Sequence, residues 1–164
     1  MGDGRRQIIG FLFPGDFLGL ANEEIYAYGA EAVANCDLCR FPRRKLEDLV
    51  SRFPTLKTRL YGVARSELAI AQDQLLLLGR KRAIEKVATM LLMFSKRAER
   101  RSTPDNPVFV PMIREDMGDY LGLTTETVSR TITQLKTKGV IRLEAGNKVR
   151  LLDIDALVAM SEGF

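Results

Sequence analysis

The sequence contains no histidine, only two cysteines and no long hydrophobic run. Without histidine, a Ser-His-Asp or Cys-His catalytic arrangement and every zinc site that uses His are excluded. Two cysteines among 164 residues cannot build a disulfide framework, so we expect a protein of the reducing cytoplasm. No apolar run approaches the roughly 18 residues that a membrane span needs, and we expect neither a membrane segment nor a signal peptide.

The charge of the chain is unevenly distributed. Residues 1–79 hold 10 Lys or Arg and 10 Asp or Glu, whereas residues 80–164 hold 15 and 11, so the second half carries the whole net charge of +4. A basic half joined to a neutral one suggests that one module meets a polyanion. Ordinary surface charge explains the same numbers, and charge alone does not decide between the two. The 46% hydrophobic content is that of a folded globular protein.

The first 43 residues favour β structure. The segments 7–13 and 31–41 each predict a strand, and turn residues such as Pro14-Gly15-Asp16 lie between them. Two or three strands have too little area to close a sandwich or barrel. We therefore expect either that this region borrows strands from elsewhere or that it is the later part of a larger β domain.

A helical region follows Pro42. The spacing predicts a short helix over 45–53, stopped by Pro54, and a long helix over 55–78. Apolar residues on the long helix recur at intervals of 3 and 4, which is a coiled-coil seam. The seam consists of Tyr61, Ala64, Leu68, Ala71, Leu75 and Leu78.

A second apolar stripe on the same helix requires a second partner. It comprises Leu56, Leu60, Val63, Ile70 and Leu77. We expect this stripe to pack on the chain's own β domain and the seam to pack on a second copy of the chain. A helix buried wholly inside one monomer is the alternative, although so small a chain has little else to cover both faces.

Residues 113–136 predict a helix-turn-helix. A first helix ends near Gly122, which suits a left-handed turn, Gly118 allows a close approach, and Thr124 or Thr125 can cap the second helix. On that helix the apolar residues Val128, Ile132 and Leu135 define a buried face.

The opposite face of the second helix is polar. It carries Glu126, Ser129, Arg130 and Thr133. Arg bonds guanine bidentately, Glu accepts from the cytosine amino group, and Ser bonds either way, so these side chains suit the major groove. Glu126 alone also suits any helix N-terminus, and Glu126 with Arg130 is also a plain i, i+4 surface pair. The helix-turn-helix spacing favours DNA recognition over those alternatives.

A β-hairpin is expected after the second helix. The strands 140–143 and 148–152 are joined by the turn Ala145-Gly146-Asn147, as in the wing of a winged helix. Basic residues surround the hairpin and suit phosphates, which position a protein without reading sequence. The expected contacts to the DNA backbone are Thr125, Thr133, Lys136, Lys138, Arg142, Lys148 and Arg150.

The segments 119–124 and 126–130, Asp-Tyr-Leu-Gly-Leu-Thr and Glu-Thr-Val-Ser-Arg, resemble the recognition motif of the Crp/Fnr superfamily of bacterial transcription regulators, in its Fnr/FixK branch. The resemblance extends back through 75–81 to 13–19. It implies a homodimer that binds a palindrome related to TTGAT-N4-ATCAA, with Glu126, Ser129 and Arg130 contacting the bases of each half-site. RNA polymerase is an implied partner.

This chain departs from the family pattern in its effector domain. The resemblance implies a jelly-roll-like effector domain, of which this chain holds only the later part. Cyclic-nucleotide members place Arg beside the bound phosphate, and the corresponding stretch 17–30 contains no arginine, so we expect no cyclic nucleotide.

The resemblance aligns Cys39 with an iron–sulfur ligand of oxygen-sensing members. Cys36 and Cys39 alone cannot supply four thiolates, so we expect an iron–sulfur cluster only in a more complete chain. A C-x-x-C redox pair is disfavoured, because residues i and i+3 of a strand point to opposite faces.

The sequence thus predicts an α+β protein of three parts: a partial β-roll effector domain at 1–43, a short helix and dimerisation helix at 44–79, and a winged helix-turn-helix at 80–164. The expected function is sequence-specific DNA binding in transcription regulation, without enzymatic activity and with a link to oxygen or redox control. The alternative is an interaction protein whose winged helix docks on other proteins. A basic wing favours DNA, because protein docking does not require it.

Overall fold

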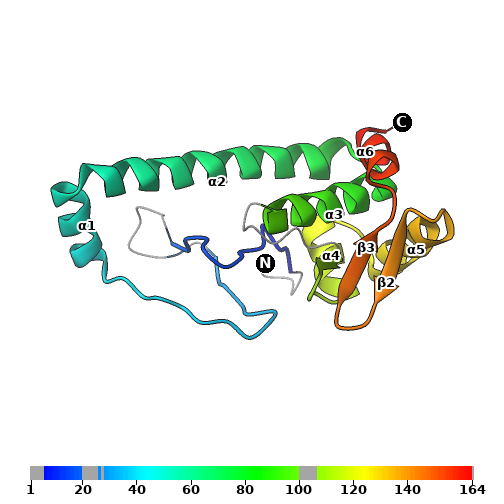
Figure 1. Cartoon of the computed structure of the whole chain (residues 1–164), viewed down its shortest axis with the longest axis horizontal. Coiled ribbons are helices and arrows are strands. Elements are labelled where there is room, and N and C mark those ends of the chain that lie inside the picture. The colour runs from blue at the N-terminus through cyan, green and yellow to red at the C-terminus, as the bar shows by residue number, and fades with distance from the viewer. Residues whose placement is uncertain (1–5, 20–25, 27, 100–106, 164) are drawn as a thin grey trace. The chain divides into compact units, whose positions relative to one another are not determined.

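The structure is a computed structural model and describes residues 6–19, 26, 28–99 and 107–163. The elements follow one another in the order α1, α2, α3, β1, α4, α5, β2, β3 and α6 (Figure 1). The chain divides into two compact units, residues 11–74 and residues 75–164 together with 1–10. None of the helices in the described residues is long and apolar enough to cross a membrane.

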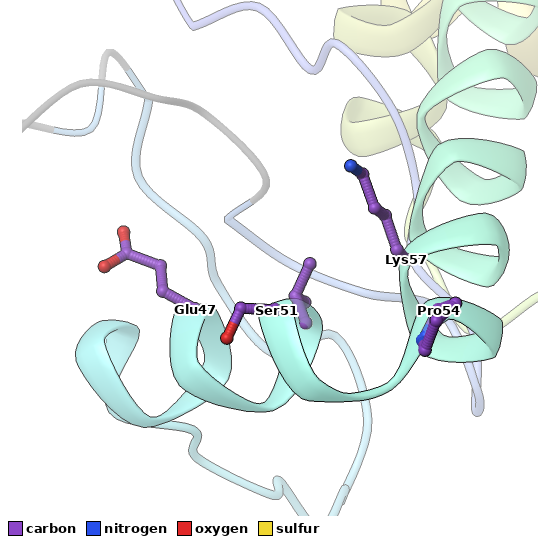
Figure 2. A pocket seen from close by; sticks show the side chains of 5 residues that line it. Glu47, Ser51, Pro54 and Lys57 are labelled. Atoms are coloured by element: carbon purple, nitrogen blue, oxygen red, sulfur yellow. The ribbon is translucent and has the colours of Figure 1, made fainter.

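The first unit contains α1 (Arg43–Arg52) and most of α2 (Pro54–Arg80). Proline fits the first position of a helix and cannot continue the preceding one, which explains why Pro54 separates the two helices. A hollow of about 460 Å³ lies at their junction, lined by Glu47, Val50 and Ser51 of α1 and by Pro54 and Lys57 of α2 (Figure 2). Both helices confirm the sequence prediction within two residues at each end.

The second unit is built on α3 (Ala83–Glu99), which packs against α6 (Ile154–Glu162), α5 (Thr125–Thr137) and β1 (Val108–Phe109). Its core is apolar and closely covered. The most buried side chains include Val87, Met90, Leu91, Phe94, Met117, Leu121, Val128, Leu135 and Leu157. The basic half of the sequence therefore has a core of its own.

A three-stranded antiparallel sheet completes the second unit. Its order is β1-β3-β2, with β2 at Ile141–Glu144 and β3 at Lys148–Leu151. Ile141 pairs with Leu151 and Glu144 pairs with Lys148 across the hairpin. Gly146 and Asn147 of the turn have φ values of 74° and 58°, a region that glycine and asparagine enter most readily. The predicted wing hairpin is confirmed, while β1 was not expected from the sequence.

Two predictions about local structure are wrong. The segments 7–13 and 31–41 form no strand in the described part of the chain. A strand requires a neighbour to pair its backbone N–H and C=O groups, and apolar content alone cannot supply one. Ile113 is 62% exposed because it occupies the N-cap position, before the first turn of α4 (Arg114–Leu121). The combination of helices with an antiparallel sheet confirms the mixed fold class, whereas a β-roll at 1–43 stays a prediction.

Candidate nucleic-acid interface

The turn between α4 and α5 is held by two glycines. Gly122 ends α4 with a φ of 62°, which is the left-handed conformation that the sequence predicted. A Cβ on Gly118 would lie 2.6 Å from the backbone oxygen of Leu123, too close for any real side chain. The N–H of Leu123 donates to the oxygen of Gly118 at 3.0 Å. Gly118 is thus needed for the turn itself to fold back on α4.

Helix α5 begins at a capping threonine and has two distinct faces. The hydroxyl of Thr124 accepts from the N–H of Thr127 at 3.2 Å. One face is buried in the core through Val128, Ile132 and Leu135, at most 4% exposed. The opposite face is open to solvent and carries the side chains Glu126, Ser129, Arg130 and Thr133. The predicted division into core and exposed polar face is confirmed.

The exposed face is charged at the first turn of α5. Backbone N–H at the helix start, the Thr124 hydroxyl and Arg130 hold the pKa of Glu126 below its ordinary value of 4.5. Glu126 is therefore an ionised acceptor at neutral pH, as a contact to a cytosine amino group requires. The ion pairs in the described residues do not include Glu126 with Arg130. Instead, Arg130 donates to the hydroxyl of Thr127 at 3.5 Å.

The wing hairpin lies beside α5, since β2 packs against that helix. Lys136, Lys138, Arg142 and Lys148 are all exposed, as phosphate contacts must be. Arg150 differs, because its Nε and Nη2 donate to the two carboxylate oxygens of Glu144 at 2.5 and 3.3 Å. This pair lowers the pKa of Glu144 and raises that of Arg150. Arg150 therefore braces the two strands of the wing as well as offering charge.

The seam of α2 is largely uncovered in the single chain. Tyr61, Leu68 and Leu75 are 62%, 61% and 72% exposed. Ala64 and Ala71 are exposed as well, while Leu78 is half-buried with its Cδ2 3.2 Å from where a Cβ of Gly122 would stand. The second stripe of the helix is less exposed, with Leu77 at 4%. The two faces thus differ in exposure, and the dimer interface along the seam stays a prediction.

Sequence reasoning missed two lysines that hold the second unit together. Lys86 is 7% exposed and donates to the backbone oxygen of Leu121 at 2.9 Å. Burial lowers the pKa of Lys86. Lys81 donates to the Thr89 hydroxyl at 2.8 Å and to the backbone oxygen of Ser161 at 2.9 Å. No pattern in the sequence separates these lysines from surface lysines, because a long side chain reaches a buried carbonyl only once the fold brings it near.

A segment far from the helix-turn-helix in sequence also contacts it. Arg6 donates to the Oδ1 of Asp116 at 2.8 Å, and the N–H of Ile8 donates to the backbone oxygen of Asp119 at 3.3 Å. Asp116 is itself buried and accepts from the N–H of Ile113 at 3.2 Å, which caps α4. No pattern in the sequence indicates this contact.

The residues present do not fit an iron–sulfur cluster. Cys36 and Cys39 are both free and exposed, and the described residues hold no cluster of three or more potential metal ligands among His, Cys, Asp and Glu. Four thiolates are needed for such a cluster. Part of the stretch 17–30, where the family would bind a cyclic nucleotide, lies outside the described residues.

A winged helix-turn-helix with an exposed polar recognition face is a nucleic-acid-binding class of domain, and comparison with known sequences agrees. Residues 85–160 match the profile described as a Crp-like helix-turn-helix domain. Residues 1–53 match the profile described as a cyclic nucleotide-binding domain. The second match covers the region in which the sequence predicted a partial effector domain.

Similar proteins are named as transcription regulators. The transcriptional activatory protein AadR of Rhodopseudomonas palustris is 44% identical over 160 residues, which cover 96% of this chain and 66% of AadR. The nitrogen fixation regulation protein FixK of Bradyrhizobium diazoefficiens is 41% identical over 160 residues, covering 96% of this chain and 67% of FixK. The structure of FixK2 from Bradyrhizobium japonicum is 38% identical with a TM-score of 0.64, and the match covers 72% of this chain and 58% of FixK2.

The chain belongs to the Crp/Fnr family, in its FixK-like branch. It spans about two thirds of the length of these curated relatives. The family resemblance predicted from the helix-turn-helix motif is therefore confirmed. The relatives are regulators rather than enzymes, which agrees with the expectation that this chain has no enzymatic activity.

Proposed function

We propose that this protein is a transcription regulator that binds double-stranded DNA sequence-specifically as a homodimer. The observation that carries the proposal is the exposed face of α5, where ionised Glu126 stands with Ser129 and Arg130 directly opposite the buried Val128 and Ile132. A helix fixed by its apolar side and offering a donor, an acceptor and a hydroxyl on the other side suits the major groove.

Base contacts and backbone contacts fall to different residues. Glu126, Ser129 and Arg130 contact base edges. The positions assigned to phosphates are Thr125, Thr133, Lys136, Lys138, Arg142, Lys148 and Arg150, all of them on α5, at its end or on the wing. Arg150 is the weakest member of this set, because its guanidinium already bonds Glu144.

Dimer formation buries the exposed seam of α2. Each side chain such as Leu68 or Leu75 transferred from water to an interface gains roughly 1.5–3 kcal/mol, which is ample drive for association along a long helix. The interface residues are Tyr61, Ala64, Leu68, Ala71, Leu75 and the half-buried Leu78. A two-fold dimer presents two copies of α5, so its target is a palindrome. We assign the TTGAT-type sequence that the family motif implies.

The remaining partners follow from the same assignment. An activator at a promoter contacts RNA polymerase, and the names of AadR and FnrL of Cereibacter sphaeroides state an activator's role for those proteins. We place the protein in the cytoplasm, where its DNA lies. We assign the protein no cyclic nucleotide, because residues 17–30 contain no arginine that could bind its phosphate. We assign it a role in oxygen or redox control.

Fluorescence anisotropy tests the proposal. Binding of the purified protein to a labelled TTGAT-type palindrome is compared with binding to a scrambled duplex of equal length and composition, at one stated salt concentration. We expect the palindrome to bind more tightly by a factor of about 10³ or more. Equal affinity for both duplexes would refute sequence-specific binding and favour the alternative, a winged helix that docks on proteins.

A further inference from the structure

Arg130, to which we assign a base contact, lies against a pair of threonine hydroxyls at the start of α5. An Nη2 proton of Arg130 points to the Thr127 oxygen at 3.5 Å. The Thr127 and Thr124 hydroxyl oxygens lie 3.0 Å apart. The side chains of Arg130, Thr127 and Thr124 thus form one connected chain of contacts.

The chemistry of the groups gives this chain a direction. A guanidinium can only donate hydrogen bonds. The Thr127 hydroxyl therefore accepts from Arg130 and has its own proton free for the Thr124 oxygen.

We propose that Thr127 is a positioning residue that determines base specificity by holding the guanidinium of Arg130 in its DNA-contacting orientation. The proposal rests on the function proposed above. It assigns a role to a residue of the recognition helix that makes no base contact itself.

The arrangement suits recognition because a guanidinium has five donors. One contact to Thr127 leaves enough N–H groups for a bidentate bond to guanine, which uses two. A side chain already ordered in the free protein loses less rotamer entropy on binding. Thr127 thus favours the correct base without adding to non-specific affinity.

The test uses the whole chain with three substitutions on α5. Thr127→Val removes the hydroxyl at nearly constant shape, and Thr127→Ser keeps it. Thr137→Val is the matched control, because it makes the same change roughly three turns further along the helix. We expect Thr127→Val to reduce the palindrome-to-scrambled affinity ratio roughly three- to tenfold, with the other two variants near the wild type.

A double-mutant cycle separates positioning from a direct contact. Thr127→Val should cause no further loss of the ratio once Arg130 is Ala, because the two residues act as one unit. Additive losses in the cycle, or an equal loss on both duplexes, would overturn the proposal and indicate that Thr127 contacts the DNA backbone itself.

A measurement without DNA keeps the proposal independent of the function. Nitrogen-15 relaxation of the Arg130 Nε–H reports the order of its guanidinium in the free protein. We expect Thr127→Val to lower the order parameter and Thr127→Ser to preserve it. Identical order parameters in all variants would contradict the contact. If the wild type does not favour the palindrome but the order parameter falls as expected, the proposed function fails while the positioning contact stands.

Discussion

Lys86 of α3 donates a hydrogen bond of 2.9 Å to the backbone oxygen of Leu121, in the last turn of α4. The carbonyls at the end of a helix have no partner within the helix, and a cation there opposes the negative end of its dipole. Because the next residue, Gly122, starts the turn into α5, this bond attaches the helix-turn-helix to the core of its unit. The orientation of α5 is thus fixed from both sides, by Lys86 behind α4 and by the core beneath Val128.

The close approach at Gly118 predicts a large effect of a single methyl group. Gly118→Ala places a Cβ 2.6 Å from the backbone oxygen of Leu123, so the turn must shift. We expect the free energy of unfolding to fall by roughly 1–3 kcal/mol in urea denaturation. Gly79→Ala is the control in the same unit, since nothing lies within 4 Å of its Cβ position, and it should leave stability unchanged or slightly higher. If Gly118→Ala is as stable as the wild type, the backbone oxygen of Leu123 lies further from Gly118 than in this structure.

Tyr120 predicts a loss of stability at high pH. Burial raises the pKa of Tyr120 to about 12 from an ordinary 10, and its hydroxyl donates to the Met93 sulfur at 3.6 Å. The folded state therefore keeps the proton between pH 10 and 12 while the unfolded state loses it. The resulting stabilisation is present below pH 10 and declines by about 2–3 kcal/mol as the pH rises through 12.

Paired denaturation curves of the wild type and Tyr120→Phe at several pH values isolate that contribution. The difference between the two free energies of unfolding should shrink above pH 10. Parallel curves up to pH 12 would show that Tyr120 ionises as readily in the folded protein as in the unfolded one.

The apolar seam of α2 predicts a dimer that dissociates when charged side chains replace its leucines. Leu68→Glu with Leu75→Glu puts two carboxylates per chain into an apolar interface, which should cost several kcal/mol. We expect a monomer by sedimentation equilibrium at concentrations where the wild type is a dimer. Ser66→Glu, exposed on the same helix but off the seam, is the matched control and should remain dimeric. A dimer of unchanged stability in the double variant would place the interface elsewhere.

Lys148 on the wing predicts a loss of DNA affinity that does not depend on the DNA sequence. Lys148 is exposed and contacts phosphate in the proposed complex, so Lys148→Ala removes one charge without removing a base contact. Affinity should fall by a similar factor for the palindrome and for scrambled DNA. The slope of log K against log salt should become shallower by about one unit. A loss confined to the palindrome would instead assign Lys148 to base recognition.

The sequence was sufficient wherever a local pattern determines structure. Periodicity placed α2 and α5, Thr124 and Gly122 marked the ends of the turn, and the polar face of α5 followed from its buried one. It was insufficient where structure depends on distant partners. The segments 7–13 and 31–41 form no strand in the part of the chain that the structure describes. The bonds of Arg6 to Asp116 and of Lys86 to Leu121 join residues far apart in the chain.

In the proposed complex α5 contacts base edges through Arg130, and the substitution Arg130→Ala tests that contact. Affinities of the wild type and Arg130→Ala are measured by fluorescence anisotropy on the palindrome, on scrambled DNA and on palindromes with single base pairs exchanged. We expect Arg130→Ala to lose roughly 1–3 kcal/mol of binding free energy on the palindrome and almost none on scrambled DNA. At one base pair of each half-site where the wild type discriminates between bases, the variant should bind all bases equally. An equal loss on palindromic and scrambled DNA, with base preference unchanged at every position, would contradict that contact.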